Sequence, residues 1–178
     1  RIETKIVPPH IAESWVRSRY YGVDPFCITP KAYLSPADYQ ERISQNGPLI
    51  QLTTPILENV FKSFGAAQYV VSLYDKDGYH MIRLGNPEDI RIRARHGVRE
   101  GLCFDENHLG TCGFALAKKL RRAVRVTGCE NYLSLLHQMA GVYSPIVDPL
   151  SKDLVGVIAV GGADLFHYHP SHPGRSLY

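Results

Sequence analysis

The spacing of apolar residues changes abruptly near residue 65. Between Leu49 and Phe64 apolar side chains recur at the period of a helix, whereas residues 68–74 read QYVVSLY and are rich in β-branched and aromatic types. This run leads directly into Asp-Lys-Asp-Gly at 75–78, and another apolar run follows at 79–84. A strand, a tight turn and a second strand predict a β-hairpin. A helix followed by a hairpin is typical of an α+β fold, in which helices cover an antiparallel sheet.

The rest of the chain extends this pattern. A proline-led helix is predicted over 10–21, a serine-capped helix over 35–44, and a kink near Pro55 in the third helix. Further along, the spacing predicts an irregular basic segment at 91–99, helices at 110–120 and 130–139, and strands at 121–126, 142–147 and 154–160. We therefore expect a central antiparallel sheet of about five or six strands flanked by helices.

Composition narrows the class of protein. The 178 residues are 44% hydrophobic, which is enough for one substantial core. The net charge is only +3, and the Lys and Arg residues are scattered along the chain, so the sequence does not predict nucleic-acid binding. The sequence has neither an apolar run of membrane-spanning length nor the apolar core of a signal peptide, so we expect a cytoplasmic protein that does not contact membranes. The glycine-rich nucleotide motifs are also missing.

The cysteines are irregularly spaced and form no CxxC pair. A chain of this length folds without covalent crosslinks, so free thiols are expected at the four positions, Cys27, Cys103, Cys112 and Cys129. The sequence begins with Arg1 rather than Met, which suggests a piece of a longer protein whose flanking parts carry the output function.

Four segments, in order, carry a family resemblance. The first is SWVRS at 14–18 with YGVDP at 21–25, and the second is GLCFDE at 101–106 with GTCGFALA at 110–117. The third is GCENY at 128–132, and the fourth is SPIVDP at 144–149 with LVGVI at 154–158. Together they resemble the N-terminal sensory region of sigma-54-dependent transcriptional activators of the acetoin-catabolism-regulator type, which has a GAF fold.

The resemblance implies a layout and a set of partners. It divides the chain into an N-terminal helical extension at 1–47, a GAF ligand-sensing domain at 48–163 and an exit linker at 164–178. A small-molecule effector and a homodimer are the implied partners, and no cofactor and no catalytic activity are expected. DNA and the sigma-54 polymerase would be contacted only through an ATPase and a helix-turn-helix domain outside this chain.

The resemblance also implies a ligand pocket between the sheet and the segments around the fourth strand. Arg83, His108 and Tyr143 are its most informative members, because such polar side chains are unusual in a plain core. Gly110 and Thr111 are expected to begin a helix whose amides face the pocket. The complete predicted set is Val71, Leu73, Met81, Arg83, Cys103, Phe104, His108, Thr111, Cys112, Tyr132, Leu136 and Tyr143. An effector bound there is expected to change the packing of the loop at 103–108 and to shift the helices at 10–21 and 49–64.

Two alternatives remain open. Cys112 stands where these activators often carry Asn, and GTCG at 110–113 is similar to the GVCG of free methionine-(R)-sulfoxide reductases, which are GAF enzymes. Those enzymes need an attacking cysteine after the next helix, but the corresponding residues 138–145 read QMAGVYSP. The second alternative is a protein-binding or dimerisation module that uses the amphipathic helix at 49–64.

Other polar clusters have simpler explanations. His167, His169 and His172 could bind a metal, but a His-Pro-rich stretch is also typical of the domain exit in such activators, and we predict no metal site. Asp75 and Asp77 are explained by turn formation, because the spacing of a calcium loop is missing.

Overall fold

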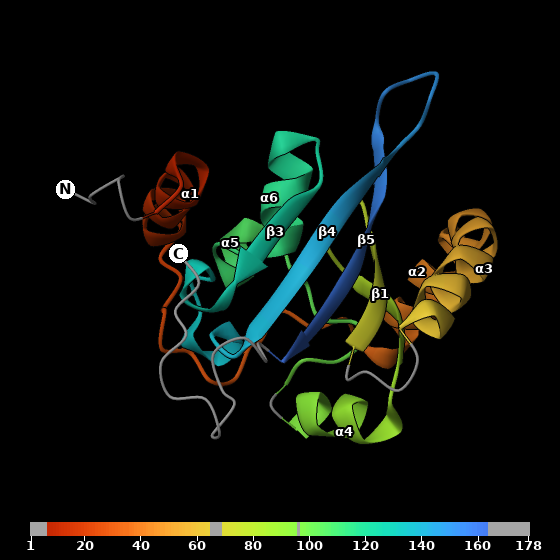
Figure 1. Ribbon diagram of the computed structural model, residues 1–178, viewed down its shortest axis with the longest axis horizontal. Coiled ribbons are helices and arrows are strands. Elements are labelled where there is room, and N and C mark those ends of the chain that lie inside the picture. The colour runs from red at the N-terminus through yellow and green to blue at the C-terminus, as the bar shows by residue number, and fades with distance from the viewer. Residues whose placement is uncertain (1–6, 65–68, 96, 164–178) are drawn as a thin grey trace.

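A five-stranded antiparallel sheet forms the centre of the fold (Figure 1). The computed structural model describes residues 7–64, 69–95 and 97–163. The strands lie in the order β2-β1-β5-β4-β3, which places β5 in the middle of the sheet. Their bounds are β1 (Tyr69–Asp75), β2 (His80–Gly85), β3 (Val124–Thr127), β4 (Met139–Val147) and β5 (Leu154–Ala163). The predicted α+β class is confirmed, with helices flanking an antiparallel sheet in a GAF-like arrangement.

Helices cover both faces of the sheet (Figure 1). On one face α3 (Gly47–Ser63) packs against β1, β2 and β5, with α2 (Pro36–Gln45) beside it. On the other face α6 (Gly113–Leu120) packs against β3, β4 and β5, and α1 (Pro9–Tyr20) contacts α6 and the short α5 (Glu106–Leu109). The remaining elements are α4 (Pro87–Arg95) and two 3₁₀ turns, η1 (Gly128–Glu130) and η2 (Ser134–Leu136).

The alternation of side chains in β1 separates two apolar cores. Tyr74 belongs to the larger core, which contains the fully buried Phe114 of α6. Val71 and Leu73 point to the opposite face and pack with Leu57 of α3. Because successive strand residues face opposite sides, β1 is buried on both faces. The sheet is therefore an interior layer between two sets of helices.

The N-terminal segment is part of this packing. Ile11 of α1 is fully buried in the larger core with Phe114, so the first helix packs onto the rest of the fold. The predicted cap of α2 is confirmed, because the Ser35 hydroxyl accepts a hydrogen bond of 3.2 Å from the amide of Asp38.

None of the described helices combines the length and apolar character needed to cross a membrane.

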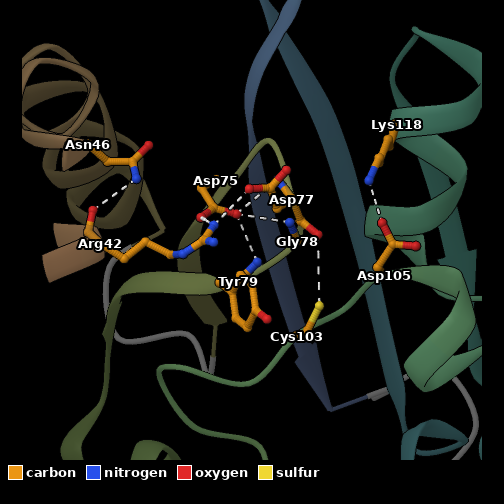
Figure 2. Close-up of polar contacts among 9 residues, drawn as sticks. All are labelled: Arg42, Asn46, Asp75, Asp77, Gly78, Tyr79, Cys103, Asp105 and Lys118. Carbon is orange, nitrogen blue, oxygen red and sulfur yellow. Dashed lines mark hydrogen bonds and ion pairs between the residues drawn. The ribbon is translucent and has the colours of Figure 1, made fainter. Parts of the chain in front are cut away.

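The predicted hairpin turn is confirmed and is held by Asp75 (Figure 2). Its Oδ1 accepts hydrogen bonds from the amides of Asp77, Gly78 and Tyr79 at 2.9–3.0 Å. Arg42 of α2 donates to the carboxylates of Asp75 at 2.6 Å and Asp77 at 2.8 Å, which ties the turn to the helix layer. Gly78 has a φ of +104°, a conformation that residues with a side chain rarely adopt. Turn formation thus accounts for both aspartates.

Two predicted elements differ from the structure. The segment at 91–99, expected to be irregular, contains the end of α4 at Arg95. The helix predicted over 130–139 is wrong, because only the turns η1 and η2 form before β4 begins at Met139. The Asn131 side chain donates to the carbonyls of Gly128 and Leu136, and these contacts hold the segment as a compact loop. The predicted third helix continues through Pro55 to Ser63.

Candidate ligand-binding site

A cavity of about 50 Å³ lies against the face of the sheet that carries Tyr74. A single water needs roughly 10–15 Å³, so this space accommodates only a few atoms and is smaller than a usual small-molecule site. Residues from every strand except β3 contribute to its wall, together with α4 and the loops before α5 and β4. The lining residues are Val70, Ser72, Tyr74, His80, Arg83, Arg93, Val98, Phe104, Asn131, Leu136, Met139, Ala140, Tyr143, Ala159, Gly161 and Gly162.

His80 provides a polar group that lacks a partner. Its ring is 1% exposed and stacks on Tyr74, with 4.8 Å between the ring centroids. Arg83 Nη2 lies 2.9 Å from His80 Nδ1, and because a guanidinium can only donate, Nδ1 must be the acceptor. Burial, followed by the charge of Arg83, lowers the pKa of His80 well below 6.5, so the neutral ring carries its proton on Nε2. The backbones of Ile82 and Arg99 lie near the ring and raise its pKa to a smaller extent, but within the described residues no acceptor meets Nε2 with hydrogen-bonding geometry.

Arg83 places a buried positive charge beside the cavity. The residue is 8% exposed, and its Nη1 donates a hydrogen bond of 2.8 Å to the carbonyl of Val98. The carboxylate of Glu100 lies 3.9 Å from Arg83 Nε, beyond hydrogen-bonding distance, and is itself partly exposed. The guanidinium is therefore fixed in position, while its charge is only weakly neutralised by this carboxylate.

The cavity contains four of the twelve residues predicted from the sequence: Arg83, Phe104, Leu136 and Tyr143. Val71 and Leu73 do not line it, because they face α3 on the opposite side of the sheet. The neighbouring positions Val70, Ser72 and Tyr74 take their place. The buried Met81, Cys103, Thr111 and Cys112, the half-buried Tyr132 and the exposed His108 also lie outside the lining. Ligand contact at all twelve positions stays a prediction.

The residues missed by the sequence interpretation share a cause. Since β1 is buried on both faces, its apolar residues run continuously and give no alternation from which to choose the cavity side. The register between β1 and β2 also shifts at Leu73 and Tyr74, so that Tyr74 pairs with His80. Ser72 was the available signal, because one polar residue inside an apolar run marks the side that faces other polar groups.

Tyr143 connects the cavity to the start of α6. Its ring lies so close to Gly113 that a Cβ at that position would come within 1.9 Å of Cδ2. Burial raises the pKa of Tyr143 well above 10, so the phenol stays protonated and can both donate and accept a hydrogen bond. The expected cap of this helix differs in the structure, because Cys112 occupies the N-cap position and makes no side-chain capping bond.

The two buried cysteines have thiols that are poorly suited to nucleophilic chemistry. Cys112 is 1% exposed and its thiol donates to the carbonyl of Phe104 at 3.2 Å. Burial raises the pKa of Cys112 to about 12 and also raises the pKa of Cys103, whose Sγ contacts the Asp77 carbonyl (Figure 2). Both thiols are therefore protonated near neutral pH. All four cysteines are free, as expected.

Three of the four segments that carry the family resemblance meet at α1. Arg17 donates two hydrogen bonds to Glu106 of α5, and Ser14 also donates to that carboxylate. Ser18 accepts a hydrogen bond of 2.8 Å from the amide of Thr111. Trp15 Nε1 donates at 2.9 Å to the carbonyl of Glu130 in the third segment. These motif residues hold α1 to the loops that border the cavity.

A second and larger hollow lies on the other face of the sheet. It measures about 860 Å³ and lies between α2, α3 and the two turns that join β1 to β2 and β4 to β5. Leu52 and Ile56 of α3 border it and are 74% and 51% exposed. None of the residues predicted to bind a ligand lines this hollow.

The described residues contain no group of three or more His, Cys, Asp or Glu side chains placed to hold a metal ion. His167, His169 and His172 lie outside those residues.

Comparison with known proteins shows which family the chain resembles. Residues 2–164 match the model of the MimR N-terminal domain. The propane 2-monooxygenase operon transcriptional activator MimR of Mycolicibacterium goodii is 26% identical over 158 residues, or 88% of this chain and 26% of that protein. The acetoin dehydrogenase operon transcriptional activator AcoR of Bacillus subtilis (strain 168) is 25% identical over 150 residues, or 84% of this chain and 25% of that protein. The chain therefore spans about a quarter of the length of these relatives.

A solved structure supports the fold. The crystal structure of the E. coli DhaR(N)-DhaL complex contains a chain that matches this one with a TM-score of 0.81 and 20% identity, over 87% of this chain and 52% of that chain. The resemblance to activators of the acetoin-catabolism-regulator type is confirmed, since AcoR itself is among the relatives. Because the family model covers nearly the whole sequence, the chain belongs to the MimR N-terminal domain family.

Proposed function

We propose that this chain is the sensory domain of a bacterial transcriptional activator and that a small-molecule effector binds in the cavity beside His80. The single observation that supports effector binding most is the buried Nε2–H of His80, which has no acceptor among the described residues. Leaving such a donor unpaired costs about 1–3 kcal/mol, and an effector that supplies an acceptor recovers part of it. Relatives whose names include the words transcriptional activator support the regulatory role.

The contacts between α1 and the cavity border suggest how binding is transmitted. Phe104 lines the cavity, and Glu106 follows two residues later with the hydrogen bonds to Arg17. An effector that moves the loop at 103–108 is therefore expected to displace α1 through this contact. To change the balance between two arrangements of the loop and α1, the effector needs only to bind one of them more tightly than the other. A difference of a few kcal/mol in binding free energy is sufficient. In the full protein we propose that this change controls a sigma-54-dependent ATPase and a DNA-binding part outside this chain.

Thiol catalysis is the less supported alternative. Cys112 lies outside the cavity lining, and burial keeps its thiol protonated. A nucleophilic cysteine needs the opposite environment, in which a base or positive charge favours the thiolate. A regulatory domain without catalytic activity is therefore the preferred interpretation.

A thermal-shift screen tests effector binding. We expect at least one compound from a panel of small ketones, diols, acids and phenols to raise the melting temperature of this chain in a saturable way. Replacing Ala159, which lines the cavity and pairs with Tyr143 on the same face of the sheet, with Leu should fill the space and abolish the shift. The matched control is Val142→Leu, because Val142 lies on the neighbouring strand, pairs with Val160 on the opposite face of the sheet and is exposed. A panel without any saturable shift, or binding that survives Ala159→Leu unchanged, would contradict the proposal.

A second candidate function is dimerisation through α3. Leu52 and Ile56 lie one helical turn apart, are both largely exposed and border the larger hollow, so we propose that they contact a second copy of the chain. Light scattering after size exclusion should give a dimer for the native chain and a monomer for Ile56→Lys. Gln51→Lys, at an exposed position of the same helix, should remain dimeric. A native chain that is monomeric at high concentration would refute this candidate.

A further inference from the structure

The polar groups around the smaller cavity indicate which class of effector it takes. This question rests on the proposed function, since it concerns the ligand of the same cavity. Two arginines, Arg83 and Arg93, line the cavity, and neither Asp nor Glu belongs to its described lining. His80 contributes a donor rather than an acceptor, because its Nδ1 is already used by Arg83. The wall therefore presents positive charge and N–H groups toward the bound molecule.

The arrangement of His80 and Arg83 strengthens this preference. Arg83 donates to Nδ1, and a positive neighbour on one side of an imidazole makes the N–H on the other side a better donor. A negatively charged acceptor at Nε2 is attracted both by the polarised N–H group and by the guanidinium charge of Arg83. The carboxylate of Glu100 neutralises that charge only weakly, because it lies 3.9 Å from Arg83 Nε. A cationic ligand would be repelled by the same groups.

We infer that the effector is a small organic acid whose carboxylate accepts the hydrogen bond from His80 Nε2 and lies beside the Arg83 guanidinium. The remaining lining is suited to a short apolar remainder, since Val70, Phe104, Leu136 and Ala159 form much of the wall. Because the cavity measures about 50 Å³, only the smallest organic acids fit into it in this conformation.

The test compares acids with neutral compounds of the same shape. Acetate and propanoate are titrated against acetamide and propanamide at constant ionic strength and neutral pH, with melting temperature and calorimetric affinity as readouts. We expect the acids to bind at least tenfold more tightly than the matched amides, because only the acids pair with the buried charge. The ¹H–¹⁵N signal of His80 Nε2–H should shift on adding acid, which reports contact at this atom directly.

Variants identify the groups responsible. His80→Phe keeps an aromatic ring against Tyr74 but removes the donor, and Arg83→Gln removes the charge; each should weaken acid binding about tenfold or more. The matched control is Arg91→Gln, because Arg91 is an exposed cation that pairs with Glu88 at the surface. Acid binding should be unchanged in that variant. Should one cavity variant fail to fold, the other variant and the native His80 signal still decide the outcome.

The possible results separate this inference from the proposed function. Amides or ketones that bind in the cavity as tightly as the acids would overturn the inference and leave effector sensing intact. Acid binding that persists in both His80→Phe and Arg83→Gln would locate it elsewhere and also overturn the inference. If neither acids nor any neutral compound of the wider panel binds in a way that Ala159→Leu abolishes, both the inference and the proposed function fall.

Discussion

Arg17 and Glu106 are 89 positions apart in the sequence and form a paired contact, in which Nε and Nη2 each donate a hydrogen bond of 2.8 Å to the carboxylate. The carboxylate is only 12% exposed, and Ser14 donates to it as well. Two parallel bonds between a guanidinium and a carboxylate fix relative orientation as well as distance. This contact therefore sets the angle at which α1 meets the loop bordering the cavity.

Replacing Glu106 with Gln should loosen that contact. The amide accepts fewer of the three hydrogen bonds and loses the charge, so the free energy of unfolding should fall by about 1–2 kcal/mol in urea denaturation. The control is Glu88→Gln, because Glu88 forms an exposed pair with Arg91 that should contribute less than about 0.5 kcal/mol. Equal losses in the two variants would contradict an orienting role for Glu106.

A side chain at position 113 should be poorly tolerated. Gly113→Ala brings its Cβ within 1.9 Å of the Tyr143 ring, and such overpacking should lower the free energy of unfolding by about 1–3 kcal/mol. Gly47→Ala is the matched control, because Gly47 also begins a helix and a Cβ there meets nothing within 4 Å. Adding Tyr143→Leu to Gly113→Ala should recover part of the loss, which a double-mutant cycle measures. Additive effects of the two changes would refute the contact.

The stability of the domain should fall on acidification because of His80. Burial lowers the pKa of this ring well below 6.5, so the folded state resists the proton that the unfolded state accepts. Stability is therefore full above about pH 6.5 and is lost as the pH falls toward the folded-state pKa. Urea unfolding at pH 5 and pH 7.5 should give a smaller difference for His80→Phe than for the native chain. An identical pH difference in both would exclude His80 as a source of the acid sensitivity.

Cys112 should produce the opposite dependence at alkaline pH. Its folded-state pKa of about 12 exceeds the usual thiol value of 9.0, so the contribution is complete below about pH 9 and is lost as the pH rises through about 12. Between pH 8 and pH 10 the native chain should lose more stability than Cys112→Ser. Thiol labelling of the native chain at pH 8 should modify the exposed Cys129 and spare Cys112. Rapid native labelling of Cys112 would contradict its burial.

Most of the order of helices and strands could be predicted, because hydrophobic spacing reflects local secondary structure. The hairpin at Asp75 and the cap at Ser35 depend on residues close in sequence, and both predictions are confirmed. The segment at 130–139 has helix-like spacing, but the side chain of Asn131 bonds to carbonyls on both sides of the loop. That competition between side chain and backbone does not appear in a periodicity pattern.

The cavity was less accessible to sequence reasoning than the fold. Arg83 and Tyr143 could be selected because their chemistry is unusual for a core, and both line the cavity. The importance of His80 depends on three facts that only tertiary structure provides: its burial, the bond from Arg83 to Nδ1, and an unpartnered Nε2. To decide whether Val70 or Val71 faces the cavity, the strand register must be known. In a strand that is covered on both sides, neither burial nor composition indicates that register.

The proximity of Tyr143 to Gly113 restricts how related sequences can diverge. A relative that acquires alanine or a larger residue at the position of Gly113 must also reduce the ring at the position of Tyr143, since the two cannot occupy the same volume. The two positions should thus covary during evolution, and because Tyr143 lines the cavity, each such exchange would also reshape the space open to an effector. A change of chemical preference between relatives can begin at a backbone position that no effector touches.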